Sequence, residues 1–189
     1  ILNDVLNFTG FDYDSLKQIA LEKTFSAFPL RGLTLSSEIH NKVRYLQSHN
    51  IAAVKKGIVY PDEYILFMAH WDHLGMIDST QPGENNIMNG AVDNATGVAA
   101  ILEFAKRFSE VETDRSIMFL AVTLEESGLL GSEYFAKYPP IDLDNIVAGF
   151  NYDGILPTGL TNDMVVVGYG ASELEDLLEN ELAKSGRYI

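Results

Sequence analysis

The chain has 189 residues, 47% of them hydrophobic, which is enough for one substantial core and predicts a single domain over residues 1–189. Thirteen basic residues against 27 acidic ones give a net charge of −14, which argues against binding to nucleic acid or to an anionic membrane surface. The absence of cysteine excludes disulfides and thiolate zinc sites, and no apolar run approaches the roughly 20 residues of a membrane span.

The first predicted element is a helix over residues 11–25, inside an N-terminal lead-in region of residues 1–30. Asp12 or Asp14 can cap this helix, and apolar residues follow at helical spacing. Residues 33–46 alternate in part between apolar and polar side chains. They therefore predict a strand that pairs with the next apolar stretch, 51–54.

The rest of the chain alternates between predicted strands and helices. The run 64–69 is apolar throughout, as in a strand that is buried on both faces. The segment 74–91 is too long for a simple connection, so we predict a functional loop there. The later elements are a helix at 95–108, a strand at 117–124, a helix at 129–138, strands at 146–152 and 164–167, and a helix at 172–185. This alternation predicts the α/β class: a three-layer α/β/α sandwich with a mixed, largely parallel central sheet.

Four short clusters of acidic residues and histidine lie where these strands end or where a helix begins. They read A-H-W-D-H-L-G at 69–75, G-A-V-D-N-A-T-G at 90–97, T-L-E-E-S-G at 123–128 and N-Y-D-G at 151–154. Ligands of such sheets collect beyond the carboxyl ends of the strands. An imidazole and several carboxylates at that edge form an oxygen-rich site for one or two zinc-class ions, which indicates metal-assisted hydrolysis.

The first cluster pairs His70 with Asp72. In extended chain the two side chains point the same way, and a carboxylate can fix the tautomer of a histidine whose other nitrogen binds metal. An isolated H-x-D is more often a hydrogen-bonded surface pair, so this role depends on the other clusters. His73 is interpreted as a packing or loop contact in preference to a ligand. Trp71 is interpreted as a core residue, with a wall of the substrate site as the alternative.

The other clusters supply carboxylates. Asp93 could simply cap the helix that follows, or its two oxygens could bridge two cations. Glu125 and Glu126 should repel each other unless a cation binds, so one can ligate metal while the other acts as general base; the alternative is a solvated acidic loop. Asp153 could be a turn residue, but beside the other clusters we predict a ligand.

Together the four clusters resemble those of the di-zinc aminopeptidases of metallopeptidase family 28, clan MH, over at least residues 50–189. The resemblance implies the phosphorylase/hydrolase-like α/β/α fold of zinc exopeptidases and hydrolysis of peptides with a free N-terminus, by water activated between two zinc ions. It also implies one role for each acidic or histidine residue: His70 and Asp153 bind one zinc, Asp72 orients His70, Asp93 bridges the two ions, Glu126 binds the second zinc, and Glu125 is the general base.

One feature departs from the family pattern. That pattern supplies a further histidine to the second zinc in a downstream S-D-H-type segment, and this chain has no histidine after Asp153. We therefore expect a fragment that lacks its C-terminal part, is inactive, binds at most one zinc tightly at His70, and self-associates through an open sheet edge. The start at Ile1 rather than methionine is compatible with a removed leader, and because relatives are commonly exported we expect a periplasmic or secreted protein.

Three other functions fit parts of the pattern. A glutaminyl-cyclase-like acyltransferase shares the fold but uses one zinc, and the combination of H-W-D-H-L-G with D-N-A-T-G is closer to the peptidases. A non-catalytic relative, such as the transferrin-receptor ectodomain, would have lost ligands, whereas the four ligands that fall within this chain are present. An acidic binding module without catalysis would show no metal-dependent stabilisation.

Overall fold

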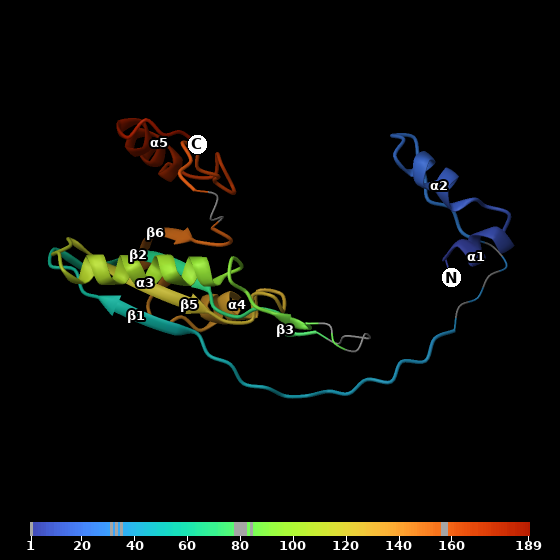
Figure 1. Ribbon diagram of the computed structural model, residues 1–189, viewed down its shortest axis with the longest axis horizontal. Coiled ribbons are helices and arrows are strands. Elements are labelled where there is room, and N and C mark those ends of the chain that lie inside the picture. Colours follow the sequence, from blue (N-terminus) through green and yellow to red (C-terminus); the bar gives the residue numbers. More distant parts are fainter. Residues whose placement is uncertain are drawn as a thin grey trace. The chain divides into compact units, whose positions relative to one another are not determined.

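The structure is a computed structural model, and it describes residues 2–30, 32, 34, 36–77, 83, 85–155 and 159–189. The chain divides into two compact units, Ile1–Tyr45 and Leu46–Ile189 (Figure 1). Residues 36–49, around the boundary between these units, are exposed and have no regular secondary structure. The single catalytic domain expected over residues 1–189 stays a prediction.

The first unit contains two helices, α1 (Leu2–Phe8) and α2 (Tyr13–Ala20). The carboxylate of Asp12 caps α2 by accepting a hydrogen bond from the backbone nitrogen of Ser15 at 2.8 Å, which confirms the predicted helix over a shorter range. The strand predicted at 33–46 is wrong for the described residues of that range, because their side chains stay exposed and no neighbouring strand pairs with them.

The second unit is built on a four-stranded sheet in the order β1-β5-β2-β6. Its strands are β1 (Ile51–Lys55), β2 (Tyr60–His70), β5 (Arg115–Val122) and β6 (Ile146–Asn151). β2 runs parallel to both β5 and β6, whereas β1 pairs antiparallel with β5. The predicted mixed, largely parallel sheet is therefore confirmed. The partner of β1 is β5, whereas the sequence predicted that residues 33–46 would pair with it.

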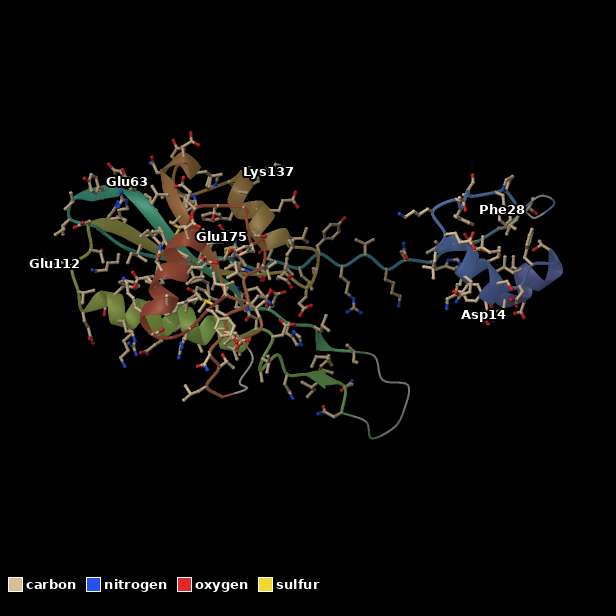
Figure 2. The ribbon with its side chains drawn as sticks, turned by 90° about the horizontal axis from the view of Figure 1, so that it is seen from above. Asp14, Phe28, Glu63, Glu112, Lys137 and Glu175 are labelled. Carbon is tan, nitrogen blue, oxygen red and sulfur yellow. The ribbon has the colours of Figure 1, made fainter. Side chains whose placement is uncertain are left out.

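Helices cover both faces of this sheet (Figure 2). On one face, the ring of Phe67 lies 5.4 Å from that of Phe104 in α3 (Ala95–Ser109). On the other face, Phe135 of α4 (Leu130–Lys137) packs in a cluster with Met118 and Leu120, both of which are almost completely buried. Since successive side chains of a strand point to opposite faces, each apolar strand contributes to both layers. The three-layer α/β/α sandwich is confirmed.

The remaining elements lie in connections and in the C-terminal part. A two-stranded hairpin, β3 (Gly75–Met76) with β4 (Ile87–Met88), occupies the predicted loop 74–91, of which residues 78–82 and 84 lie outside the described residues. A 3₁₀ turn, η1 (Leu143–Asn145), precedes β6, and α5 (Leu174–Lys184) confirms the last predicted helix.

The strand predicted at 164–167 is wrong. Only a single bridge between Asp163 and Tyr188 forms near it, and Val165 and Val167 are 86% and 96% exposed, so these apolar side chains lack the burial that a strand of the sheet provides. Across the described parts of the chain, every helix is too short or too polar to cross a bilayer.

Candidate metal centre

The carboxyl ends of β2, β5 and β6 lie at one edge of the sheet and carry three of the four clusters. His70 is the last residue of β2 and is 2% exposed, Glu125 and Glu126 follow β5, and Asp153 follows β6. Asp93 joins them from the turn that precedes α3. The parallel strands thus bring together residues that are more than 80 positions apart in the sequence.

A first group of ligand atoms surrounds His70. Its Nε2 atom lies 3.0 Å from Oδ1 of Asp93, 3.3 Å from Oδ1 of Asp153 and 4.0 Å from Oε2 of Glu125. Zinc bonds of about 2.0–2.2 Å in tetrahedral geometry place neighbouring ligand atoms roughly 3.3 Å apart. One imidazole and two carboxylates at these spacings fit a zinc ion, and the half-exposed side chains of Asp93 and Asp153 leave the position open to solvent.

Asp72 contacts His70 in a different way from the one expected. Nδ1 of His70 donates to the backbone oxygen of Asp72 at 3.0 Å, while the nearest carboxylate oxygen is 3.8 Å away. The carboxylate instead accepts from the backbone nitrogens of Glu125 at 3.1 Å and Glu126 at 3.4 Å. Asp72 therefore fixes the tautomer of His70 through its main chain and fixes the glutamate pair through its side chain.

The turn that carries the glutamate pair has an unusual backbone. Leu124, immediately before Glu125, has a φ of +56°, and Leu129 has a φ of +63°, a region that residues other than glycine seldom adopt. The backbone oxygen of Glu125 accepts hydrogen bonds from Gly128 and Leu129, both at 2.9 Å. These bonds hold the turn closed between β5 and α4, and backbone strain of this kind concentrates at functional sites.

Asn94 caps α3, so Asp93 does not. The side-chain oxygen of Asn94 accepts from the backbone nitrogens of Gly97 at 3.1 Å and Gly154 at 3.2 Å, and its amide donates to the backbone oxygen of Tyr152 at 2.9 Å. The alternative role of Asp93 as a helix cap is therefore excluded. Its carboxylate is free to face His70.

The charges in this group shift two titration equilibria. Burial alone would lower the pKa of His70, but the hydrogen bond to Asp72 and the negative charge of Asp153 raise it above its ordinary value. Partial burial, together with the charges of Asp153, Glu126 and Asp93, raises the pKa of Glu125. The neighbouring carboxylates contribute to both shifts, after burial for Glu125 and after the backbone hydrogen bond for His70, and a cation at this place would offset their charge.

A second group of ligand atoms contains His73, which the sequence pattern assigned to packing. Nδ1 of His73 lies 2.6 Å from Oε1 of Glu126. One possible ligand atom each of His73, Glu126 and Asp93 lies within 4.8 Å of the other two. Asp93 thus belongs to both groups. The available signal in the sequence was a second histidine three residues after His70, in the same cluster.

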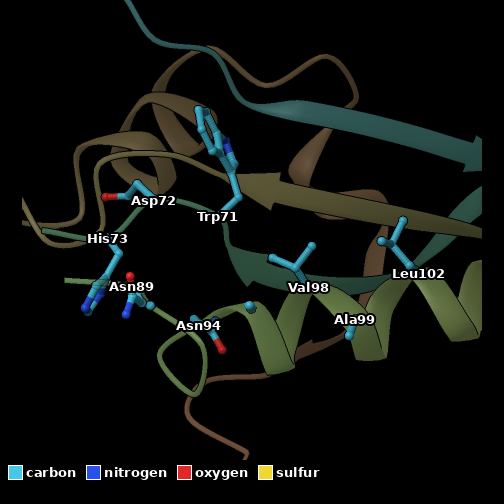
Figure 3. Close-up of a pocket in the computed structure, with 10 residues that line it drawn as sticks. Trp71, Asp72, His73, Asn89, Asn94, Val98, Ala99 and Leu102 are labelled. Carbon is cyan, nitrogen blue, oxygen red and sulfur yellow. The ribbon is translucent and has the colours of Figure 1, made fainter. Parts of the chain in front are cut away.

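A cavity of about 320 Å³ lies beside the second group (Figure 3). Trp71 and His73 line it from the loop after β2, and Val98 and Leu102 project into it from α3. Trp71 is 46% exposed, and its Nε1 atom donates to the backbone oxygen of His49 at 3.1 Å. The prediction that Trp71 is a core residue is therefore wrong: its ring forms a cavity wall next to the two groups of possible metal ligands.

Curated proteins with similar sequences include a zinc metalloprotease and an aminopeptidase. A probable zinc metalloprotease of Pyrenophora tritici-repentis is 36% identical over 103 residues, which is 54% of this chain and 23% of the relative. Aminopeptidase YwaD of Bacillus subtilis is 29% identical over 145 residues, 75% of this chain and 27% of that protein. The chain thus spans about a quarter of the length of these relatives.

Solved structures share the fold. A leucine aminopeptidase precursor from Bacteroides thetaiotaomicron matches 72% of this chain and 52% of its own, with a TM-score of 0.55 at 24% identity. A glutaminyl cyclase from the same organism matches 73% of this chain and 59% of its own, with a TM-score of 0.53 at 21% identity. At these identities the likeness concerns the fold alone.

The family assignment follows from the part of the chain that carries the site. The family model described as peptidase family M28 matches residues 50–189, which include the whole sheet and all four clusters. This range is well over half of the chain. The chain therefore belongs to peptidase family M28.

Proposed function

We propose that the complete protein is a zinc-dependent aminopeptidase that removes N-terminal residues from peptides with the help of two cations. The observation that carries the proposal is the position of Nε2 of His70, 3.0 Å and 3.3 Å from carboxylate oxygens that come from two other loops, with Glu125 4.0 Å away. Membership of peptidase family M28 and the similarity to aminopeptidase YwaD support the choice of reaction.

The ligands would be divided between two positions that share one carboxylate. His70 and Asp153 would hold the first zinc, Glu126 the second, and Asp93 would bridge them. When bound, the zinc ions supply Lewis-acid chemistry: they lower the pKa of water and polarise the peptide carbonyl.

Glu125 would be the general base. Its side chain is 31% exposed, lies beside the first group without belonging to it, and has a raised pKa, which favours proton uptake at a working pH near neutral. It would take a proton from the attacking water and pass it to the leaving amine. The backbone contacts of Asp72 to residues 125 and 126 would keep this carboxylate in place.

The substrate would carry a free α-amine. The half-exposed carboxylates of Asp93 and Asp153 give the open side of the site a negative potential that attracts an ammonium group. A peptide terminus presents that charge, whereas an internal peptide bond does not. Self-association through a sheet edge and a periplasmic or secreted location stay predictions.

The test compares two neighbouring glutamates in the complete protein. Glu125→Gln should lower the turnover of amino-acid amides by at least the ~10²-fold that loss of a general base costs, with zinc content retained. Glu126→Gln should lower the zinc content itself. Glu133→Gln, on the exposed surface of α4, is the matched control and should change neither quantity.

Two outcomes would contradict the proposal. Full activity of Glu125→Gln would remove the assigned base. Release of ammonia from an N-terminal glutamine, with no residue cleaved from any peptide, would instead identify the single-zinc acyltransferase reaction.

A further inference from the structure

The side chain of Asn50 joins the two ends of the turn that carries the glutamate pair. Its amide oxygen accepts a hydrogen bond from the backbone nitrogen of Thr123 at 3.1 Å, and its amide nitrogen donates to the backbone oxygen of Gly131 at 2.7 Å. Thr123 directly follows β5, and Gly131 lies in the first turn of α4. A single amide, 73 and 81 positions away from its two partners, therefore closes the loop of residues 123–131.

This turn needs support from outside because its own backbone is strained. Leu124 and Leu129, with φ of +56° and +63°, both lie between the two residues that Asn50 joins. Such conformations persist only where the surrounding structure holds them. Thr123 is only 5% exposed, and a buried backbone nitrogen requires a hydrogen-bond acceptor, which Asn50 supplies. Without that side chain the start of the turn loses its partner and the turn should relax.

Asn50 is itself held in a fixed place. It immediately precedes β1, whose pairing with β5 begins at Ile51. The backbone oxygen of the preceding residue, His49, accepts a hydrogen bond from Nε1 of Trp71 at 3.1 Å. Gly131 allows α4 to approach this point, since a Cβ atom there would lie 2.8 Å from the amide oxygen of Asn50. The amide is therefore a rigid support against which the turn is placed.

We propose that Asn50 is a positioning residue for Glu125, acting through the turn and without touching the substrate. The carboxylate of Asp72 holds the middle of the same turn through the backbone nitrogens of Glu125 and Glu126, and Asn50 holds its two ends. Together these contacts fix the distance of 4.0 Å between the carboxylate of Glu125 and Nε2 of His70. The inference rests on the proposed function, in which Glu125 is the general base.

The test measures the hydrolysis of amino-acid amides by the complete protein at saturating zinc, with zinc content determined alongside because the turn also carries Glu126. Asn50→Leu has a similar size and forms neither hydrogen bond. It should lower kcat ~10-fold or more and leave KM nearly unchanged, since a misplaced catalytic group weakens only the reaction step. Asn50→Asp keeps the accepting oxygen and loses the donor, so its kcat should lie between those of the wild type and Asn50→Leu.

Ser48→Ala is the matched control. The hydroxyl of Ser48 lies 2.6 Å from Oγ1 of Thr123, so this variant removes a hydrogen bond between the same two segments. It contacts only one end of the turn, however, and should leave kcat unchanged. Urea unfolding establishes that each variant is folded, and if Asn50→Leu does not fold, Asn50→Asp serves for the same comparison.

A double variant separates positioning from a merely structural role. In the background of Glu125→Gln, Asn50→Leu should cause no further loss of kcat, because the group that it positions is already gone. Loss by the same factor in both backgrounds, or a wild-type kcat in Asn50→Leu, would overturn the inference and leave the proposed function intact. Full activity of Glu125→Gln, or no hydrolysis by the wild-type protein, would instead overturn the proposed function and this inference with it.

Discussion

Asn94 joins the helix that follows Asp93 to the loop that carries Asp153, so its removal should disturb both the fold and the metal site. Its side chain is 2% exposed and makes three hydrogen bonds, to the backbones of Gly97, Gly154 and Tyr152. Loss of a helix cap costs about 1 kcal/mol. Each of the other two backbone groups, left without a partner, adds about 1 kcal/mol at the lower end of the usual range, because both are only partly buried. Asn94→Ala should therefore destabilise the metal-free chain by about 3 kcal/mol.

Urea unfolding followed by fluorescence measures this loss selectively. Trp71 is the only tryptophan and lies in the second unit, so its emission reports the sheet and not α1 and α2. With a slope of about 2 kcal/mol per molar urea, the midpoint should fall by about 1.5 M. Asn94→Asp keeps both accepted hydrogen bonds and loses only the donated one, so it should cost about 1–2 kcal/mol.

Thr96→Ala is the matched control in the same helical turn. It removes a single exposed hydrogen bond, 2.6 Å long, to the backbone oxygen of Val92, and should cost less than about 1 kcal/mol. Zinc affinity should fall about 10-fold or more in Asn94→Ala, since Asn94 supports the loops of two ligands, and stay unchanged in Thr96→Ala. If the two alanine variants unfolded at the same urea concentration, the network assigned to Asn94 would not hold these elements together.

Two further predictions concern the fold away from the metal. A Cβ atom at Gly131 would lie 2.0 Å from the backbone oxygen of Thr123, so Gly131→Ala should destabilise the chain by about 3 kcal/mol or more. Gly149→Ala is the control, because a Cβ atom there meets nothing closer than 4.0 Å. Equal urea midpoints of the two variants would contradict the close approach of α4 to the end of β5. Burial would raise the pKa of Glu175, but hydrogen bonds from Ser172 and its neighbours lower it below its ordinary value. The ionised carboxylate therefore stabilises the start of α5 at pH values above the unfolded pKa. This stabilisation is lost as the pH falls through the folded pKa. Glu175→Gln should therefore speed amide hydrogen exchange in α5 at pH 7, and the difference should disappear once the pH falls below the folded pKa of Glu175; equal protection at pH 7 would refute this.

Hydrophobic patterning was sufficient to predict the framework of the second unit. The apolar runs at 64–69 and 117–124 are long enough to be strands and have no polar face, so they had to be buried between two layers of helices. Since parallel strands end at one edge, the polar clusters that follow them were bound to meet there. That reasoning predicted that His70, Glu125 and Asp153 lie near one another, but it gave no distances between their side chains.

Contacts between loops depended on the tertiary structure. Periodicity reports which side chains are buried but not which strand is their neighbour, so the pairing of β1 with β5 could not be read from the sequence. The choice of Asn94 over Asp93 as the helix cap depends on backbone angles in one turn, and it leaves the carboxylate of Asp93 to face His70. In the same way, the contact between His73 and Glu126 spans 53 positions and exists only because the turns after β2 and β5 fold back toward each other at the sheet edge. Local spacing carries no information about such a distance, which is why only the three-dimensional structure revealed the second group of ligands.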